Sequence, residues 1–289
     1  MSTSLDPREW AARTVNWPPA RTAVKRAVHL AARGRGRVLT ARDAVPDPGT
    51  IIAAGPQKAG SQWIKALFDH PVVRAQTGLL TLPQLDYELT PPRNGFPAGT
   101  YVPGFYGTYQ DYLALPKRHP HKVVYLGRDP RNVVVSGYWS AVETHRPTHL
   151  EEAERLRLEL KQMSMDEALL RIISLCGGHF AAMASWVGAD DPDVARFRLE
   201  DVARDSEAVV RAMLEHCGIE LSEADLATLL RDTSKDALRA KDLAQRSPDS
   251  ESHYRSRASR YQDVFKPEHH KAIEEVAPGL VELLGYEPA

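Results

Sequence analysis

One short stretch of the chain combines glycine, lysine and serine in a spacing suited to binding an anion. Gly55-Pro56-Gln57-Lys58-Ala59-Gly60-Ser61-Gln62-Trp63 follows an apolar run at 50–54 and opens an apolar-periodic segment that continues to Leu67. This order predicts a strand, a loop and a helix. A glycine-containing turn at a helix N-terminus directs several backbone N–H groups at one ligand, which favours a phosphate or sulfate. Lys58 adds a full positive charge.

The position of this lysine distinguishes the loop from a nucleoside triphosphate site. Gly55 and Gly60 have the spacing of a Walker A motif, but that motif needs Lys-Ser/Thr directly after its second glycine, and Ser61-Gln62 follows here. A lysine inside the loop lies beside the terminal anionic group of a ligand. A P-loop small-molecule kinase, with a magnesium-linked role for Arg128 and Asp129, stays open as an alternative, although the absent Walker lysine speaks against it.

A second stretch carries a candidate phosphate site. Arg128-Asp129-Pro130-Arg131-Asn132-Val133-Val134-Val135-Ser136-Gly137-Tyr138 follows the apolar run 122–126, and Pro130 is suited to the first turn of a helix. Arg128 at the strand end can make a bidentate contact to a phosphate, and Ser136 on the helix can donate one more hydrogen bond. The same strand-loop-helix order therefore occurs twice.

Together the two stretches resemble sulfotransferases that use 3'-phosphoadenosine 5'-phosphosulfate (PAPS). The segment from Lys58 to Trp63 resembles the phosphosulfate-binding loop of that superfamily, and the segment from Arg128 to Tyr138 resembles its 3'-phosphate motif, Arg-x-Pro-x-x-x-x-x-Ser-x-Tyr. Weaker similarities follow at 199–201, 253–257 and 284–286. The resemblance spans about 50–286 and implies a PAPS-dependent sulfotransferase that needs no metal.

The resemblance also implies roles for individual residues. Lys58 would hold the bridging oxygen of the donor, the loop amides and the Ser61 hydroxyl would hold the 5'-phosphate, and Trp63 would stack on the adenine or pack in the core. Segment 253–257 resembles a loop over the 3'-phosphate, although its glycine is missing. The donor-binding residues implied are Lys58, Ala59, Gly60, Ser61, Gln62, Trp63, Arg128, Ser136, Thr233, Arg255 and Arg257.

The sequence indicates the general base and the acceptor less clearly than it indicates the donor-binding residues. Where one branch of the superfamily has a catalytic histidine, this chain has Gly107-Thr108-Tyr109, and a neutral tyrosine is a poor base at pH 7. The carbohydrate-directed branch uses a carboxylate, for which Asp86 and Glu88 are the candidates, ahead of His145 and His149. The acceptor would be a hydroxyl or amine of a small molecule, lipid or carbohydrate, beside an aromatic segment at 79–112 or with that segment as loop core.

The order of elements predicts an α/β fold, a three-layer αβα arrangement with a mostly parallel central sheet, similar to P-loop NTPases. Strands are expected at 50–54, 122–126 and 194–199. Helices are expected at 60–69, over most of 150–187, and at 205–217, 223–230 and 267–284. Residues 79–115 are expected to form a long functional loop with short elements. The chain of 289 residues divides into a basic N-terminal extension, 1–48, and a sulfotransferase domain, 49–289.

The extension is basic although the net charge of the chain is only −1. Between Arg21 and Arg42 there are seven Lys or Arg residues and no acid, on a short amphipathic helix expected to end near Gly34. This arm would contact an anionic surface, such as a membrane, or would be a solvated extension packed on its own domain. A non-catalytic nucleotide-binding protein that uses the arm is a further alternative.

Composition indicates where in the cell the protein is expected. No run is long and apolar enough to span a membrane, no signal-peptide core is present, and two cysteines exclude a disulfide framework. The chain is therefore expected to be intracellular and cytoplasmic, with no nucleic-acid partner. The oligomeric state stays open between a monomer and a homodimer.

Overall fold

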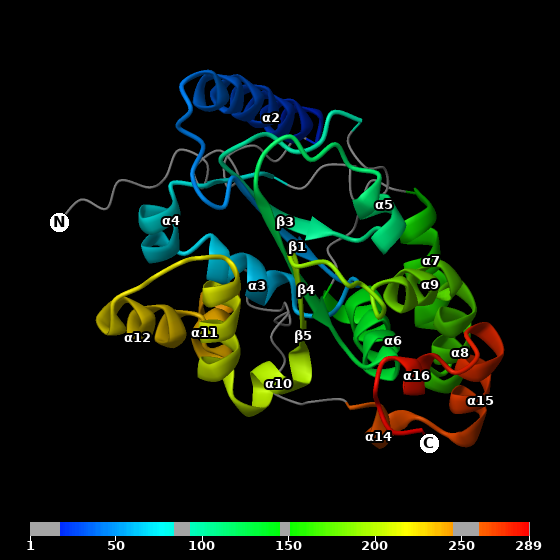
Figure 1. Ribbon diagram of the computed structural model, residues 1–289. Coiled ribbons are helices and arrows are strands. Elements are labelled where there is room, and N and C mark those ends of the chain that lie inside the picture. Colours follow the sequence, from blue (N-terminus) through cyan, green and yellow to red (C-terminus); the bar gives the residue numbers. More distant parts are fainter. Residues whose placement is uncertain (1–17, 84–92, 145–150, 245–259, 289) are drawn as a thin grey trace.

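A single parallel sheet organises the chain (Figure 1). The computed structural model describes residues 18–83, 93–144, 151–244 and 260–288. The strands are β1 (Thr50–Ala54), β2 (Leu80–Thr81), β3 (Thr100–Phe105), β4 (His121–Gly127) and β5 (Val194–Arg198), in the order β2-β3-β1-β4-β5, and every pairing is parallel. The α/β prediction is confirmed, and the three predicted strands are β1, β4 and β5.

Strand β3 is the longest of the short elements within residues 79–115, and the sequence did not locate it. That segment contains β2, β3 and helix α5 (Tyr109–Leu113) as well as loop. Pro103 and Gly104 disfavour a strand, because proline cannot donate a ladder hydrogen bond and glycine weakens a strand interior. The pairing of β1 with β3 shifts register between Ile52 and Ala54 at this point, and β2 pairs only with Thr100 and Tyr101. Pro103 therefore lies where the ladder is already interrupted.

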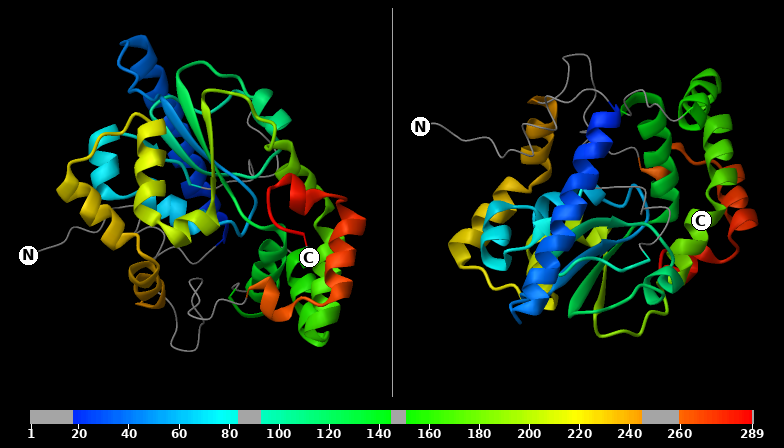
Figure 2. Two further views of the ribbon diagram at one scale, coloured as in Figure 1. Left: turned by 60° about the horizontal axis from the view of Figure 1, so that its bottom comes forward. Right: turned by 90° about the horizontal axis from the view of Figure 1, so that it is seen from above.

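Helices cover both faces of the sheet, as the two further views show (Figure 2). The helices α3 (Ser61–Phe68), α4 (Pro71–Thr77), α11 (Ser206–His216) and α12 (Glu223–Asp232) belong to one layer. Their apolar side chains share a core with Ile51, Tyr101 and Val124 of the sheet. On the opposite face, Ala32 of α2 (Pro18–Ala41) and Tyr112 of α5 share a core with the alternate strand residues.

A separate helical core lies beside the sheet. It is formed by α6 (Pro130–Trp139), the π-helix η2 (Ser140–Thr144), α7 (Glu151–Gln162), α8 (Met165–Leu175), α9 (Gly177–Ser185), α14 (Tyr261–Val264), α15 (Pro267–Val276) and α16 (Leu280–Leu283). The single helix predicted at 267–284 is two helices, because Gly279 adopts a left-handed φ of 67° between them. The remaining helices are α10 (Leu199–Arg204) and α13 (Lys235–Ala244).

Within the described ranges, no single helix is long and apolar enough to cross a membrane. Helices α8 and α9, bent by 56° at their junction, reach that length and composition only as a pair. Leu169 and Phe180 of this pair are fully buried in the helical core.

Helix α2 is longer than the sequence suggested. It continues past Gly34 to Ala41, and its carboxyl half packs closely on the domain. A Cβ at Gly36 would lie 3.0 Å from the backbone nitrogen of Ala98, so the glycine permits a close approach and does not end the helix. Arg35 donates to the carbonyls of Gly99 (2.7 Å) and Gly78 (2.9 Å). These contacts offset the low helix propensity of the two glycines.

Candidate active site

The loop between β1 and α3 has a tightly curled backbone. Gly55 has a φ of 145°, and a Cβ there would lie 2.3 Å from the carbonyl oxygen of Leu126 on β4. Lys58 has a φ of 70°, which is uncommon for a residue other than glycine, and Gly60 has a φ of 85°. Glycine at position 55 is therefore required by the approach of the neighbouring strand.

No side chain caps the N-terminus of α3. Its N-cap residue, Gly60, supplies no side-chain hydrogen bond, and no acid lies in the first turn. The amides of Ser61, Gln62 and Trp63 have no partner within the helix, because the first turn of any helix leaves its N–H groups unpaired. Ala59 differs, since its amide donates to the Pro56 carbonyl at 3.3 Å. Three successive amides at the positive end of a helix dipole suit a phosphate group.

Lys58 is held away from bulk water by a contact with α6 and η2. Its Nζ donates to the Oγ of Ser140 at 2.7 Å. Burial, with a smaller contribution from Arg128, lowers the pKa of Lys58 from 10.5 to about 8. Ser140 was not among the site residues predicted from the sequence. Its amide donates to the carbonyl of Ser136, which lies one turn earlier. Ser136 is therefore one turn before the residue that meets Lys58, and its side chain is partly exposed.

A direct contact joins the two stretches identified in the sequence. The Nη1 of Arg128 donates to the backbone carbonyl of Lys58 at 2.7 Å. Burial lowers the pKa of Arg128, although Glu200 and Asp129 oppose this effect, so two cations lie close together in a poorly hydrated place. Such an arrangement attracts a multiply charged anion, because each buried cation lacks part of its hydration.

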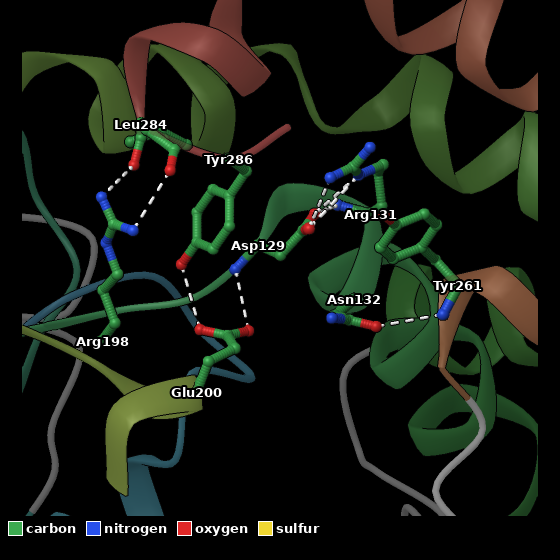
Figure 3. A network of polar contacts seen from close by, with 9 residues as sticks. Asp129, Arg131, Asn132, Arg198, Glu200, Tyr261, Leu284 and Tyr286 are labelled. Carbon is green, nitrogen blue, oxygen red and sulfur yellow. Dashed lines mark hydrogen bonds and ion pairs between the residues drawn. The ribbon is translucent and has the colours of Figure 1, made fainter. Parts of the chain in front are cut away.

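A buried ion pair fixes the N-terminus of α6 (Figure 3). Asp129 caps the helix by accepting from the Arg131 amide, and its carboxylate pairs with the Arg131 guanidinium at 2.8 Å. The side chains of Arg131 and Asp129 are 2% and 5% exposed. The guanidinium also lies 3.9 Å from the ring centre of Tyr261, whose amide donates to Asn132 Oδ1. This pair holds the helix that carries Ser136.

Glu200 ties three segments together at the same place (Figure 3). Its carboxylate accepts from the Asp129 amide at 3.2 Å and from the Tyr286 hydroxyl at 3.0 Å. Arg198 donates to the carbonyls of Leu284 and Gly285. The segments 199–201 and 284–286 were noted in the sequence only as family similarities, and their shared function is to hold the loop that carries Arg128.

The other predicted donor-binding residues lie at different depths. Trp63 is partly buried against the core between α3, α11 and α12. Thr233 caps α12, is 3% exposed, and donates its hydroxyl to the Leu229 carbonyl at 2.7 Å. The neighbouring Asp232 contacts His70 at 3.4 Å. Thr233 is therefore on the α3 side of the sheet.

Several predicted residues cannot be placed. Asp86, Glu88, His145, His149, Arg255 and Arg257 lie outside the described residues. At the position of the family's histidine, Thr108 and Asp111 form a capping box at the start of α5. Burial and Asp191 raise the pKa of the adjacent Tyr109, so its hydroxyl stays neutral. Across the described ranges, no group of three His, Cys, Asp or Glu side chains could hold a metal ion.

The family model described as "Sulfotransferase domain" matches residues 108–284, which is more than half of the chain. The chain belongs to the sulfotransferase domain family. This sulfotransferase is a PAPS-dependent enzyme, with PAPS as donor co-substrate, and the family match decides against the kinase alternative. No curated protein matches the sequence.

Solved structures share the fold at low sequence identity. Mouse sulfotransferase SULT7A1 complexed with PAP, the desulfated donor, is 16% identical over 79% of this chain and 82% of that chain, with a TM-score of 0.55. Retinol dehydratase with retinol and PAP is 16% identical over 82% of each chain, with a TM-score of 0.53. The same protein with androsterone and PAP gives a TM-score of 0.54, at 16% identity over 83% of this chain and 82% of that chain.

Proposed function

We propose that this sulfotransferase transfers the sulfuryl group of PAPS to a hydroxyl or amine of a small-molecule, lipid or carbohydrate acceptor, with Lys58 as the catalytic cation. The observation that carries the proposal is the 2.7 Å hydrogen bond from Arg128 to the Lys58 carbonyl. This bond joins the lysine loop to the arginine motif, although the two residues are 70 positions apart in sequence, and it supports assigning both to one site.

The donor fits the residues that surround this bond. Gly55 leaves no space for a Cβ against Leu126, so the loop keeps the shape that turns the amides of Ser61 to Trp63 toward a ligand. These amides and the Ser61 hydroxyl are assigned to the 5'-phosphate, beside Gly60. The Ala59 amide joins them only by leaving the Pro56 carbonyl. Arg128 and Ser136 are assigned to the 3'-phosphate, with Arg255 and Arg257 as expected additional ligands and Thr233 as a nucleotide contact.

Lys58 is suited to stabilise charge that develops during transfer. PAPS supplies an activated sulfuryl group whose leaving group is a phosphate oxygen. As the bond from sulfur to the acceptor atom forms, the bond from sulfur to the bridging oxygen breaks, and negative charge grows on that oxygen. A protonated, partly desolvated ammonium stabilises this charge more strongly than a hydrated one. The Lys58 ammonium has three N–H donors and uses one of them on Ser140, so others are available to the donor.

The acceptor proton must pass to a base during the same step. Asp86 and Glu88 are the proposed bases, because the carboxylates of the carbohydrate-directed branch occupy a similar place in sequence. Tyr109 is a poor alternative, since its raised pKa keeps the hydroxyl protonated at neutral pH. As the proton leaves, the acceptor oxygen or nitrogen forms the bond to sulfur, and the desulfated donor departs with the former bridging oxygen.

Exposure limits which aromatic residues of segment 79–112 can contact an acceptor. Tyr101, Phe105 and Tyr112 are each 1% exposed, so they form core and offer little surface to a ligand. Tyr106 and Tyr109 stay partly exposed and are proposed to face the acceptor. Retinol and androsterone are bound in the retinol dehydratase structures. These molecules support including small apolar acceptors in a screen beside glycans and lipids.

Sulfuryl transfer from labelled PAPS tests the assignment of Lys58. We expect Lys58→Ala to lower turnover by roughly 10²–10³-fold, the effect of removing one donor to a developing oxyanion. Its thermal stabilisation by PAP should remain, because the 5'- and 3'-phosphate ligands are unchanged. Lys65→Ala is the matched control, a partly exposed lysine in the last turn of the same α3. Turnover unchanged in Lys58→Ala would refute the assignment.

A further inference from the structure

The outward face of α2 carries an apolar stripe from Ala23 to Ala41. Ala23, Ala27, Leu30, Gly34, Val38 and Ala41 are all exposed. They recur every three or four residues, which is the spacing of one face of a helix. Leu30 is 74% exposed and Val38 is 49% exposed. The stripe contains no polar side chain, although it faces away from the domain.

The opposite face of the same helix is already used for packing. Ala32 is fully buried against the sheet, and Gly36 approaches the backbone of Ala98. Arg35 is tied to the carbonyls of Gly99 and Gly78, and His29 contacts the carbonyl of Pro83 at 2.8 Å. The core therefore accounts for the inner face, and the described part of the chain leaves the outer stripe exposed.

Arginines border the apolar stripe. Arg26, Arg33 and Arg37 lie along one side of it and Arg42 lies just beyond its end, while the 24 residues of α2 contain no acid. Arg26, Arg37 and Arg42 are exposed. A helix with an exposed apolar stripe and basic borders has the form of one that lies in the interface of a lipid bilayer. The long arginine side chains can reach lipid phosphates while the stripe enters the acyl boundary.

We propose that α2 docks this sulfotransferase on an anionic membrane surface. Charge complementarity selects this occupant. A second copy of the chain would bring two rows of arginines together, and a nucleic acid would leave Leu30 and Val38 unused at the centre of the face. Because Arg35 and His29 fix α2 to the domain, docking holds the enzyme in one orientation at the lipid surface.

Co-sedimentation of the full chain with lipid vesicles tests the proposal. The probes are vesicles of phosphatidylcholine mixed with phosphatidylglycerol, and vesicles of phosphatidylcholine alone. We expect binding to the mixed vesicles only, weakened by salt. Each arginine near such a surface contributes about fivefold in affinity, so Arg26→Gln with Arg37→Gln should weaken binding about 25-fold. Leu30→Gln should weaken it at least about tenfold.

Two control substitutions on other helices show whether an effect on vesicle binding is specific to the α2 stripe or follows from any change of an exposed residue. Leu158→Gln on α7 changes a leucine that is 50% exposed, and Lys271→Gln on α15 removes a cation whose side chain is 79% exposed. Both should leave vesicle binding unchanged. All variants should keep the melting temperature and the PAP-induced shift of the parent, because none touches the core or the donor site. Vesicle binding can thus fail while donor binding persists.

Three results would overturn the proposal. The first is equal binding to vesicles with and without phosphatidylglycerol, or binding to neither. The second is equal weakening by the α2 and the control substitutions. The third is a dimer in analytical ultracentrifugation that Leu30→Gln dissociates while vesicle binding is absent, which would assign the stripe to a second copy of the chain.

Discussion

The buried ammonium of Lys58 predicts a conflict between stability and catalysis. Lys58→Met removes the charge and keeps a side chain of similar length, so the desolvation cost disappears together with the proposed catalytic group. In the folded protein Lys58 loses its proton at about pH 8, whereas its ordinary pKa is 10.5. We therefore expect Lys58→Met to be inactive in sulfuryl transfer and more stable than the parent at neutral pH.

The difference in pKa sets the size of this effect. A gap from about 8 to 10.5 corresponds to about 3 kcal/mol of cost for keeping the ammonium in the folded state. Below about pH 8 both the folded and unfolded chains carry the proton, so the whole cost applies. As the pH rises through this window the folded state sheds the proton first, and the parent gains stability. Because Lys58→Met also loses the bond to Ser140, its gain at neutral pH should be about 1–3 kcal/mol.

Urea unfolding of the parent and Lys58→Met over this pH window measures the effect. The difference between the two free energies of unfolding cancels the titration of all other groups. It should shrink with rising pH by up to about 1.4 kcal/mol per pH unit. Lys65→Met on α3 serves as the control. A difference that stays constant across the window, or a variant less stable than the parent at neutral pH, would refute the argument that Lys58 carries a desolvated charge.

Three further substitutions test the architecture of the site by the same unfolding measurement. Gly55→Ala should cost at least about 3 kcal/mol, because its Cβ would lie 2.3 Å from the Leu126 carbonyl; a cost below about 1 kcal/mol would contradict the close approach. Arg131→Met should cost about 3–5 kcal/mol by leaving the Asp129 carboxylate buried and unpaired, with partial recovery on adding Asp129→Asn; an additive double variant would argue against the pair. Tyr125→Phe should be neutral or stabilise by about 1 kcal/mol, since within the described residues this buried hydroxyl has no partner; a clear loss would reveal one.

The proximity of the two candidate loops was predictable from the sequence because each belongs to a strand-loop-helix unit. Lys58 and Gly60 lie in one loop between a strand and a helix, and Arg128 and Ser136 repeat that order in the second unit. The carboxyl ends of parallel strands meet at one edge of a sheet, so two such loops come together once the sheet is parallel. The hydrogen bond from Arg128 to the Lys58 carbonyl shows that they do.

The features that were missed depend on contacts between distant segments. The helix was expected to end near Gly34, and the packing of Gly36 against Ala98 shows why it continues. Pro103 disfavours a strand until the interrupted ladder of β3 is known. Ser140 becomes part of the site only because α6 delivers it to Lys58. Glu200 bonds to Asp129 and Tyr286 across large separations in sequence, and no local pattern predicts such a bridge.

Calorimetric titration with PAP in the presence of a metal chelator tests the central claim most directly. The account predicts that the parent and Lys58→Met both bind PAP without magnesium. It also predicts that Arg128→Gln binds PAP markedly more weakly while its unfolding remains cooperative. Failure of the parent to bind PAP, magnesium-dependent ATP binding tighter than that of PAP, or unchanged affinity in Arg128→Gln would contradict the assignment of this site to the sulfuryl donor.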